Sequence, residues 1–580
     1  MSAGNEQRTG ADLFLEILRN FGVEYIFSSP GTEWAPLWES LAKQKALGMT
    51  GPQYLCARHE DIAIGMASGY SKATGKLSVC LIHSSVGSLR AAMCVRGAYQ
   101  AQVPMLVCAG ESLTFGEGAP WVGFHWGRYL EDYGGPARLM EPVVKSSFCV
   151  HDAALLGGSV HRACNLAMAS APGPVFLSIP FEVSAAPAVG TAPAATRHPL
   201  SPDANAAGLA EVAALLEGSR KPLIITERLG RRPAAVADLV KLAEAVGAVV
   251  IEAQHPEYVN FPRDHDLHGG FNAKPFLQDA DTILLLDMVG PPWYPETALR
   301  PPGARIVTIG DDPLRGRFPY HGVDGDLVLV GDAPGAVATL ARTVGGNATV
   351  ARARREELRA SNRGRRAEWH DMAQRQARAE PIDSRWMCEV LNEHLPDDAI
   401  LVDETIIQNF TMLNVMDRLR PGQYVNAMDG GLGTGLGAAL GVKTAEQGRP
   451  VVVILGDGAF NYNAPLAALG FCQEYGMPIT IIIGNNRRYL AMQMPVKLMY
   501  PGGWAARTNQ YYGAYLQPDI DYADMARLVG GYGERVTDPS GIRDALDRAL
   551  QANREGRPAI LNVIIGDELE YLGPMMKDEH

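Results

Sequence analysis

The chain has 580 residues, of which 47% are apolar and 20% charged, and its formal net charge is −12. This composition is typical of a globular protein with several buried cores and excludes a disordered chain. The acidic balance argues against non-specific binding to nucleic acid, so an anionic ligand needs a local group of basic side chains. Met1 to Gly10 is polar and no apolar run approaches membrane-spanning length, so we expect a cytoplasmic protein that does not contact a membrane.

The first part of the chain, from about Thr9 to Pro187, alternates short apolar runs with helical stretches. The expected strands are Tyr25 to Phe27, Ser78 to Ile82, Met105 to Cys108 and Val175 to Ile179. This alternation predicts a doubly wound parallel sheet.

Three polar positions in this first part are candidate functional residues. Glu60 precedes the small-residue helix Ala63 to Tyr70, where a carboxylate in the first turn also favours the helix dipole. His83 follows the apolar run Val79 to Ile82, and such a histidine is equally a catalytic group or a hydrogen-bonded core residue. Thr32 lies in the loop Pro30 to Glu33.

A Pro- and Ala-rich linker, Ala185 to Pro199, leads to a second α/β segment that ends near Thr343. Its expected strands are Leu223 to Thr226, Ala248 to Ile251 and Thr282 to Leu286. Arginines crowd the glycine in Thr226 to Gly230, which disfavours a flavin-binding loop there. The charged run Ala351 to Arg378 interleaves acidic residues with arginines and predicts a solvated connecting helix.

The third segment, Pro381 to about Ile565, contains a pattern for magnesium and a diphosphate. The apolar run Val451 to Leu455 leads into Gly456, Asp457 and Gly458, and a second run, Ile479 to Ile483, leads to Asn485 and Asn486. Glycines let the backbone approach phosphate, and carboxylate and amide oxygens are the hard ligands that magnesium prefers. A lone Gly-Asp-Gly is usually a turn, but the complete pattern is far more specific.

This pattern resembles the thiamine diphosphate (ThDP) motif of the decarboxylase and acetolactate synthase superfamily, and the likeness covers nearly the whole chain. It implies an α/β fold with three doubly wound parallel-sheet domains. These are a pyrimidine-binding domain at 1–187, a middle domain at 200–345 and a diphosphate-binding domain at 381–566, followed by a tail at 567–580. The resemblance also implies ThDP and Mg²⁺ as cofactors, with ADP as an alternative ligand of the middle domain, and a homodimer as the minimum unit, commonly a homotetramer.

The resemblance assigns roles to individual residues. The carboxyl group that activates the cofactor corresponds to Glu60, and the apolar residue that bends it corresponds to Leu432 in the loop Gly430 to Gly437. The metal ligands are Asp457, Asn486 and the carbonyl of Arg488. The remaining implied cofactor contacts are Thr405, Gly431, Gly433, Gly456, Gly458 and Ala459.

Short sequence motifs in the first segment are similar to those of the benzoylformate decarboxylases. His83-Ser84-Ser85 matches a histidine that faces the reacting carbon, and Thr32 matches the place of a catalytic serine. The resemblance breaks at Gly290 to Tyr294, which offers no histidine where those enzymes carry a second one.

Gln493 lies where several members of the superfamily carry a glutamate that moves protons. Glutamine keeps the shape and hydrogen-bonding capacity of glutamate but does not exchange a proton at neutral pH. Either another acid acts, or the chain is an isosteric Glu-to-Gln variant; we favour the second and count Gln493 among the catalytic positions.

Three branches of the superfamily compete for the substrate: acetolactate synthases, keto-acid decarboxylases, and 2-hydroxyacyl-CoA lyases. We expect the third, the actinobacterial type, which cleaves a CoA thioester such as 2-hydroxyisobutyryl-CoA reversibly to formyl-CoA and a ketone or aldehyde. Arg488, Arg507, His125 and Arg128 are candidate contacts for the CoA phosphates, and Glu568 to His580 is a candidate lid. A non-catalytic protein of the same fold is the further alternative, which intact Glu60 and Asp457 disfavour.

Overall fold

The computed structural model describes residues 7–111, 130–131, 134–194, 201–253, 255–290, 301–318, 325–428 and 430–572. These residues form two compact units. The first unit consists of Met1–Leu200, Met428–Gln447 and Asn463–Met477, and the second of Ser201–Ala427, Gly448–Tyr462 and Pro478–His580. Among the described helices, none combines the length and apolar character needed to cross a membrane.

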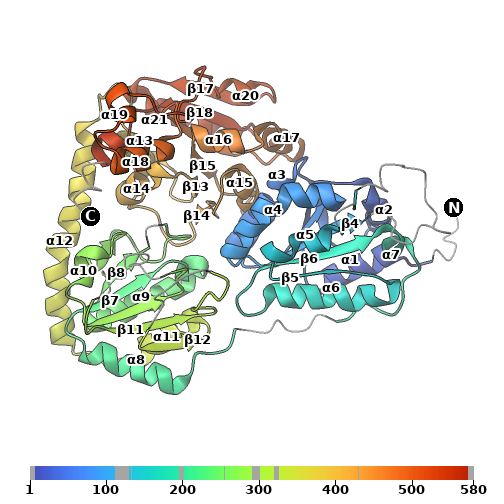
Figure 1. Ribbon diagram of the computed structural model, residues 1–580, viewed down its shortest axis with the longest axis horizontal. Helices are drawn as coiled ribbons and strands as arrows, with labels where there is room; N and C mark the ends of the chain where they lie inside the picture. Colours follow the sequence, from blue (N-terminus) through green and yellow to red (C-terminus); the bar gives the residue numbers. More distant parts are fainter. Residues whose placement is uncertain are drawn as a thin grey trace. The chain divides into compact units, whose positions relative to one another are not determined.

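The first unit contains a six-stranded parallel sheet in the order β2-β1-β3-β4-β6-β5. Its strands are β1 (Tyr25–Ser28), β2 (Gln53–Cys56), β3 (Ser78–Ile82), β4 (Met105–Glu111), β5 (Ser146–Cys149) and β6 (Pro174–Pro180). Its helices include α1 (Gly10–Asn20), α2 (Ala35–Ala46), α3 (Glu60–Thr74), α4 (Ser84–Gln100), α5 (Pro136–Met140), α6 (Ala153–Met168) and α7 (Phe181–Ala185). Helices cover both faces of the sheet (Figure 1), so the central strands are continuous buried runs.

The second unit contains two more parallel sheets of six strands each. The middle sheet has the order β12-β11-β10-β7-β8-β9. Its strands are β7 (Pro222–Thr226), β8 (Val249–Glu252), β9 (His268–Gly270), β10 (Thr282–Leu286), β11 (Arg305–Gly310) and β12 (Leu327–Val330), with helices α8 (Ala206–Gly218), α9 (Pro233–Val246), α10 (Lys274–Leu277) and α11 (Ala333–Thr343). Alternate residues of β10 enter different cores, Leu284 and Leu286 on one face and Ile283 and Leu285 on the other.

The third sheet has the order β14-β13-β15-β16-β18-β17 and carries the predicted magnesium site at one edge. Its strands are β13 (Ile400–Glu404), β14 (Tyr424–Asn426), β15 (Val451–Gly456), β16 (Thr480–Asn485), β17 (Tyr532–Val536) and β18 (Ala559–Ile564). The helices of this part of the chain include α13 (Ser384–His394), α14 (Ile407–Val415), α15 (Gly435–Ala445), α16 (Asp457–Tyr462), α17 (Pro465–Tyr475), α18 (Leu490–Met499), α19 (Trp504–Thr508), α20 (Asp524–Arg527) and α21 (Ile542–Arg554). The three sheets confirm the predicted fold class.

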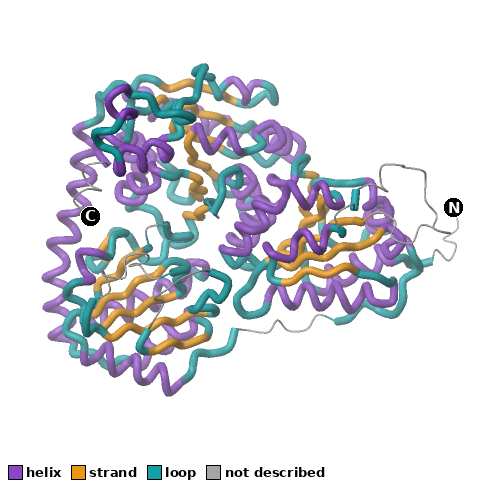
Figure 2. Tube along the Cα trace, in the orientation of Figure 1, coloured by secondary structure: helices purple, strands orange, loops and turns teal. Residues whose placement is uncertain are grey.

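The charged run between the second and third segments forms α12 (Ala348–Arg375), which has 28 residues. It contacts α9 of the middle sheet and α13 and α14 of the third sheet, so it connects these two layers of the second unit. Figure 2 shows it as one continuous helix. The predicted connecting helix is therefore confirmed.

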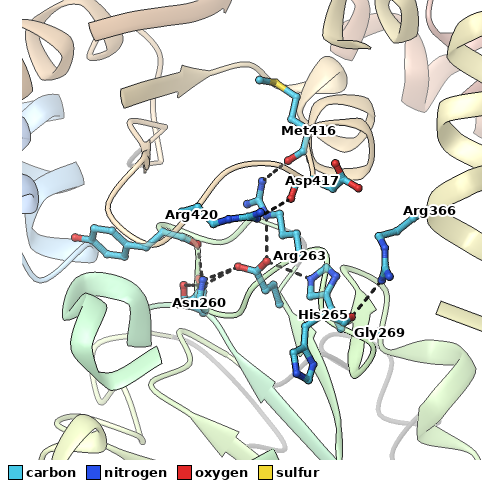
Figure 3. A network of polar contacts seen from close by, with 12 residues as sticks. Asn260, Arg263, His265, Gly269, Arg366, Met416, Asp417 and Arg420 are labelled. Carbon is cyan, nitrogen blue, oxygen red and sulfur yellow. Dashed lines mark hydrogen bonds and ion pairs between the residues drawn. The ribbon is translucent and has the colours of Figure 1, made fainter. Parts of the chain in front are cut away.

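A buried arginine joins the middle and third sheets within the second unit (Figure 3). Arg263 is 1% exposed, and its side chain donates to Glu252 Oε1 at 3.2 Å and to the Met416 carbonyl at 3.4 Å. Its guanidinium also stacks over the Tyr424 ring at 5.1 Å. Next to Arg263 in the chain, the exposed Asp264 accepts from the Arg420 guanidinium at 2.9 Å. These contacts tie the segment between β8 and β9 to the segment between α14 and β14.

Two helices of the first unit pack closely because glycines line their contact. A Cβ atom on Gly69 of α3 would lie 2.1 Å from the Ala438 carbonyl oxygen, and one on Gly441 of α15 would lie 2.0 Å from that of Met66. Only glycine allows backbones to approach this closely. Helix α15 therefore belongs to the first unit although it follows β13 and β14 of the third sheet in sequence.

Candidate functional site

Three loops at one edge of the first sheet carry the predicted pyrimidine-side residues. Strands β2, β1 and β3 are parallel neighbours, so their carboxyl ends meet at the same edge. Thr32 follows β1, Glu60 follows β2 as the first residue of α3, and His83 follows β3 as the N-cap of α4. The fold therefore gathers three residues that are far apart in sequence.

Glu60 and His83 both lie close to Gly87. A Cβ atom at Gly87 would lie 3.2 Å from Glu60 Oε1 and 3.3 Å from His83 Cβ, so the glycine leaves room for both side chains. Both residues are half-buried. The structure thus brings together two of the predicted catalytic residues.

His83 is held by a carboxylate for which the sequence pattern predicted no role. Its Nδ1 lies 2.7 Å from Glu33 Oε1 and 2.9 Å from Oε2, and Glu33 is only 5% exposed. The hydrogen bond to Glu33 raises the pKa of His83, against the opposing effect of burial, and the charges of Glu60 and Glu131 add to the rise. Thr32, next to Glu33, is exposed in the isolated chain. Glu33 could have been found from its position: it follows β1, and β1 pairs with β3, the strand that precedes His83.

The glycine-rich loop before α15 lies against α4 in the first unit. Arg96 donates to the Gly430 carbonyl at 3.1 Å, and a Cβ atom on Gly431 would meet Met93 Sδ at 2.4 Å. Leu432 is half-buried, and Gly433 has a φ of +103°. The residue expected to bend the cofactor therefore lies in the same compact unit as Glu60.

The predicted metal ligands lie in the second unit, at the carboxyl ends of two adjacent strands. Strands β15 and β16 pair in parallel with Gly456 opposite Gly484. Asp457 directly follows β15, and Asn486 directly follows β16. The structure thus brings Asp457 and Asn486 to one edge of the third sheet, as the sequence pattern predicted.

Asp457 has an oxygen suited to a cation. Its Oδ1 accepts from the Gly458 amide at 2.8 Å, whereas its buried Oδ2 has no hydrogen-bond partner among the residues that the structure describes. Burial raises the pKa of Asp457 to about 6, although backbone amides of Gly458, Arg487 and Arg488 oppose the rise. A Cβ atom at Gly456 would meet nothing within 4 Å, so there is open space beside the residue that precedes Asp457. These features fit a hard divalent cation.

The turn after β16 orders the second and third predicted ligands. Asn486 Oδ1 accepts from the Arg488 amide at 3.0 Å, and Arg487 adopts a left-handed φ of +62°. The Arg488 guanidinium donates to Asp567 at 2.9 Å. Its positive charge is therefore compensated, which weakens the expectation that it binds a CoA phosphate.

Two buried amide side chains of the second unit have unsatisfied atoms among the described residues. Gln493 on α18 is 1% exposed and its Nε2 has no partner there. Gln408 on α14 is 4% exposed, and neither its amide nitrogen nor its amide oxygen has a hydrogen-bond partner among the described residues. Its side chain lies close to Gly484. Unsatisfied buried amides cost stability and point to a ligand. Gln408 carried no sequence signal, because it is an ordinary helical residue in the pattern.

Other predicted contacts of the cofactor are also buried. Thr405 donates from its hydroxyl to Asp403 Oδ1 at 2.6 Å, which fixes the loop between β13 and α14. Ala459 lies in α16 beside the buried Gly458, where a Cβ atom would meet the Tyr489 ring at 2.7 Å.

The carboxyl edge of the middle sheet is occupied by charged side chains that pair with one another. Arg228 is 3% exposed and lies 3.4 Å from Asp287, and Arg231 bridges Asp287 at 3.2 Å and Asp311 at 3.0 Å. Because these cations are already matched by carboxylates, the described residues of this edge do not fit the phosphates of ADP or a flavin. The alternative of ADP in the middle domain is unsupported.

Several predicted features lie wholly or partly outside the described residues. His125, Arg128, residues 291–294 of the Gly290 to Tyr294 stretch and residues 573–580 of the proposed lid are among these. The described start of the tail packs onto α13 and α14: buried Glu568 accepts from the Ser384 hydroxyl at 2.8 Å, and the Tyr571 hydroxyl lies 2.7 Å from that of Thr411.

Two domain families match the chain. Residues 8–121 match the family described as thiamine pyrophosphate enzyme, N-terminal TPP binding domain, and residues 408–563 match the corresponding C-terminal TPP binding domain. The matches contain Glu60 and His83 in the first and Asp457, Asn486 and Gln493 in the second.

Similar proteins extend over the whole chain. The acetolactate synthase isozyme 3 large subunit of Escherichia coli is 25% identical, covering 98% of this chain and 97% of its own length. The benzoylformate decarboxylase of Pseudomonas aeruginosa is 27% identical, covering 94% and 97%. In structure, a 4-hydroxybenzoylformate decarboxylase of Rhodococcus jostii RHA1 superposes with a TM-score of 0.80 at 24% identity, covering 96% of this chain and 99% of that chain, which establishes a shared fold.

Proposed function

We propose, from the premise that the chain belongs to the thiamine diphosphate-dependent enzymes, that it decarboxylates a 2-keto acid of the benzoylformate class. The observation that carries this proposal is His83, held by Glu33 beside Glu60 at one sheet edge. The 27% identical relative named as a benzoylformate decarboxylase supports the same choice.

The second unit would hold the diphosphate end of the cofactor. Asp457 Oδ2, Asn486 Oδ1 and the Arg488 carbonyl are the proposed ligands of Mg²⁺, and Gly456, Gly458, Ala459 and Thr405 line the approach of the diphosphate. Thiamine diphosphate, when bound, supplies a carbon nucleophile for a substrate carbonyl and accepts the electron pair released when the neighbouring bond breaks.

The first unit would supply the acid–base groups. Glu60 would hold a proton at the pyrimidine N1′ position, which activates the cofactor's own amino group as a base. Leu432 would support the bent cofactor. His83 would face the substrate with Nε2, because Nδ1 is engaged by Glu33. Thr32 and Gln493 would complete the substrate-facing set.

The active unit would be a homodimer at least, and commonly a homotetramer. Enzymes of this superfamily place the cofactor between a pyrimidine-binding domain of one subunit and a diphosphate-binding domain of another. Glu60 and Asp457 would then act together across two copies of the chain.

A second candidate, the 2-hydroxyacyl-CoA lyase expected from the sequence, rests on one surface feature of the second unit. The exposed guanidinium of Arg507 lies 5.3 Å from the ring of Trp504, which is 76% exposed. A cation beside an exposed aromatic ring suits a phosphorylated adenine nucleotide such as CoA. The relatives reported above are not CoA lyases by name, so this candidate is placed second.

Substrate assays separate the candidates. Protein supplied with ThDP and Mg²⁺ should release carbon dioxide and an aldehyde from benzoylformate, and a chelator or omission of ThDP should abolish the release. Acetolactate formed from pyruvate, without reaction of benzoylformate, would identify an acetolactate synthase instead. Condensation of formyl-CoA with acetone to 2-hydroxyisobutyryl-CoA, without reaction of either keto acid, would overturn the proposal in favour of the lyase.

A further inference from the structure

We propose that Glu33 is a positioning residue that orients His83 and stabilises its imidazolium, so that His83 meets the substrate as a hydrogen-bond donor through Nε2. The role of His83 toward substrate rests on the proposed function. The pairing of the two side chains does not, and it is tested separately below.

The geometry allows one arrangement of the pair. Both oxygens of Glu33 lie within 2.9 Å of His83 Nδ1. Because a carboxylate only accepts, Nδ1 carries the hydrogen of this contact and Nε2 is left to face elsewhere. The His83 side chain is 26% exposed, so part of it is accessible to a small molecule.

Two glycines make room for the pair. A Cβ atom on Gly31 would lie 2.0 Å from His83 Nδ1, and one on Gly110 would lie 2.0 Å from Glu33 Cγ. Any other residue at these positions would displace the ring or the carboxylate. The close approach of backbone on both sides explains why Glu33 is almost completely buried.

The buried Glu33 carboxylate is surrounded by groups that donate to it. Its Oε1 accepts from the Ser84 amide at 2.8 Å, and Ser84 is the first residue of the 17-residue helix α4. The exposed amides and dipole of a helix N-terminus stabilise a negative charge. The His83 imidazolium supplies the remaining compensation.

The other charges that face His83 act in the same direction. Glu60 at the start of α3 and Glu131 in the segment after β4 both raise the pKa of His83, in addition to Glu33, and burial alone opposes them. These carboxylates therefore favour the protonated form of the ring. It donates from Nε2 to a carboxylate or carbonyl oxygen of the substrate and does not act as the resting base.

The test compares Glu33→Gln with the native chain and with Glu39→Gln, which removes the same charge from an exposed site on α2. Diethyl pyrocarbonate modifies neutral imidazole, so modification of the His83 peptide, followed by mass spectrometry against pH, gives its midpoint without any turnover. We expect Glu33→Gln to lower this midpoint by about one pH unit or more and Glu39→Gln to leave it unchanged. An unshifted midpoint in a folded Glu33→Gln protein would overturn the pairing.

Glu33→Asp is the second variant, for use if Glu33→Gln does not fold. It retains the carboxylate but shortens the side chain by one methylene, which moves the charge away from His83 Nδ1. It should lower the midpoint by a smaller amount, and an unchanged midpoint would again contradict the proposal. The pH profile of carbon dioxide release provides the second readout: its limb for the acid form should move with the midpoint. A shifted midpoint in a protein that releases no carbon dioxide would support the pairing of Glu33 with His83 and contradict the proposed function.

Discussion

Gly437 lies against Gly65 so closely that a Cβ atom on Gly437 would meet the Gly65 Cα at 2.9 Å. This contact joins α15 to α3 inside the first unit. Helix α3 begins at Glu60, and α15 follows the loop that carries Leu432. The packing of two backbones thus fixes a proposed catalytic carboxylate and a proposed cofactor-bending residue in one body.

Gly441→Ala should therefore destabilise the protein. Its new methyl group would lie 2.0 Å from the Met66 carbonyl oxygen, so the helices must separate, at a cost of about 1–3 kcal/mol. Thermal or urea unfolding measures the loss. Gly158→Ala in α6 is the matched control, because a Cβ atom there meets nothing within 4 Å. Equal stability of the two variants would contradict the close packing.

Asp457→Asn should weaken magnesium-dependent binding of ThDP. The change keeps the shape of the side chain but removes the anionic oxygen that has no hydrogen-bond partner within the described part of the chain. We expect the apparent dissociation constant at fixed Mg²⁺ to rise about tenfold to a hundredfold, or about 1.4–2.8 kcal/mol. Calorimetry measures it, with Asp547→Asn on the exposed face of α21 as control. Unchanged affinity would remove Asp457 from the metal site.

Gln493→Glu should raise the turnover of this chain by about a hundredfold to ten-thousandfold, the worth of one general acid–base group. Position 493 is 1% exposed, so burial would hold the pKa of an introduced carboxyl above its usual range and keep it able to exchange protons near neutrality. Gln493→Ala should change the residual rate little. Steady-state kinetics at saturating ThDP decides, and slower turnover of Gln493→Glu would show that the glutamine itself serves the reaction.

His370 should contribute stability that disappears at high pH. Its Nδ1 lies 2.7 Å from Glu389 and its Nε2 lies 3.1 Å from Asp417, and these bonds raise the pKa of His370 to about 10. Because the folded pKa is the higher one, the contribution is complete below about pH 6.5 and is lost as pH rises through 10. His370→Gln should cost about 1–2 kcal/mol at pH 7, allowing for solvent screening, and less at pH 10. Urea unfolding at both pH values measures this, and an equal cost at both would contradict it.

Buried strands and the cofactor motif could be predicted from the sequence because each depends on residues that are close together in the chain. The run Val451 to Leu455 and the positions of Asp457 and Asn486 predicted β15, β16 and their shared edge, which the register Gly456 opposite Gly484 confirms. Strand β5 was not expected, because its residues are only half-buried and its sequence, Ser-Ser-Phe-Cys, carries a weak strand pattern.

Contacts between distant segments could not be predicted from local pattern. The pairing of Glu33 with His83 joins residues 50 positions apart, and it depends on which strands are neighbours in the sheet. The placement of α15 in the first unit depends on glycines in two helices far apart in the chain. The matched charges of Arg228, Asp287 and Arg231 in the middle sheet likewise appear only once β7, β10 and β11 lie side by side.

The central claim is that Glu60 activates thiamine diphosphate in this chain. Exchange of the cofactor's C2 proton for deuterium, followed by acid quench and proton NMR, measures that activation before any substrate is chosen. We predict fast exchange in the native protein and, in Glu60→Gln, retained binding of ThDP with exchange slowed by about a hundredfold or more, because the amide has no acidic proton to share with the pyrimidine nitrogen. Equally fast exchange in Glu60→Gln with ThDP bound would contradict the account.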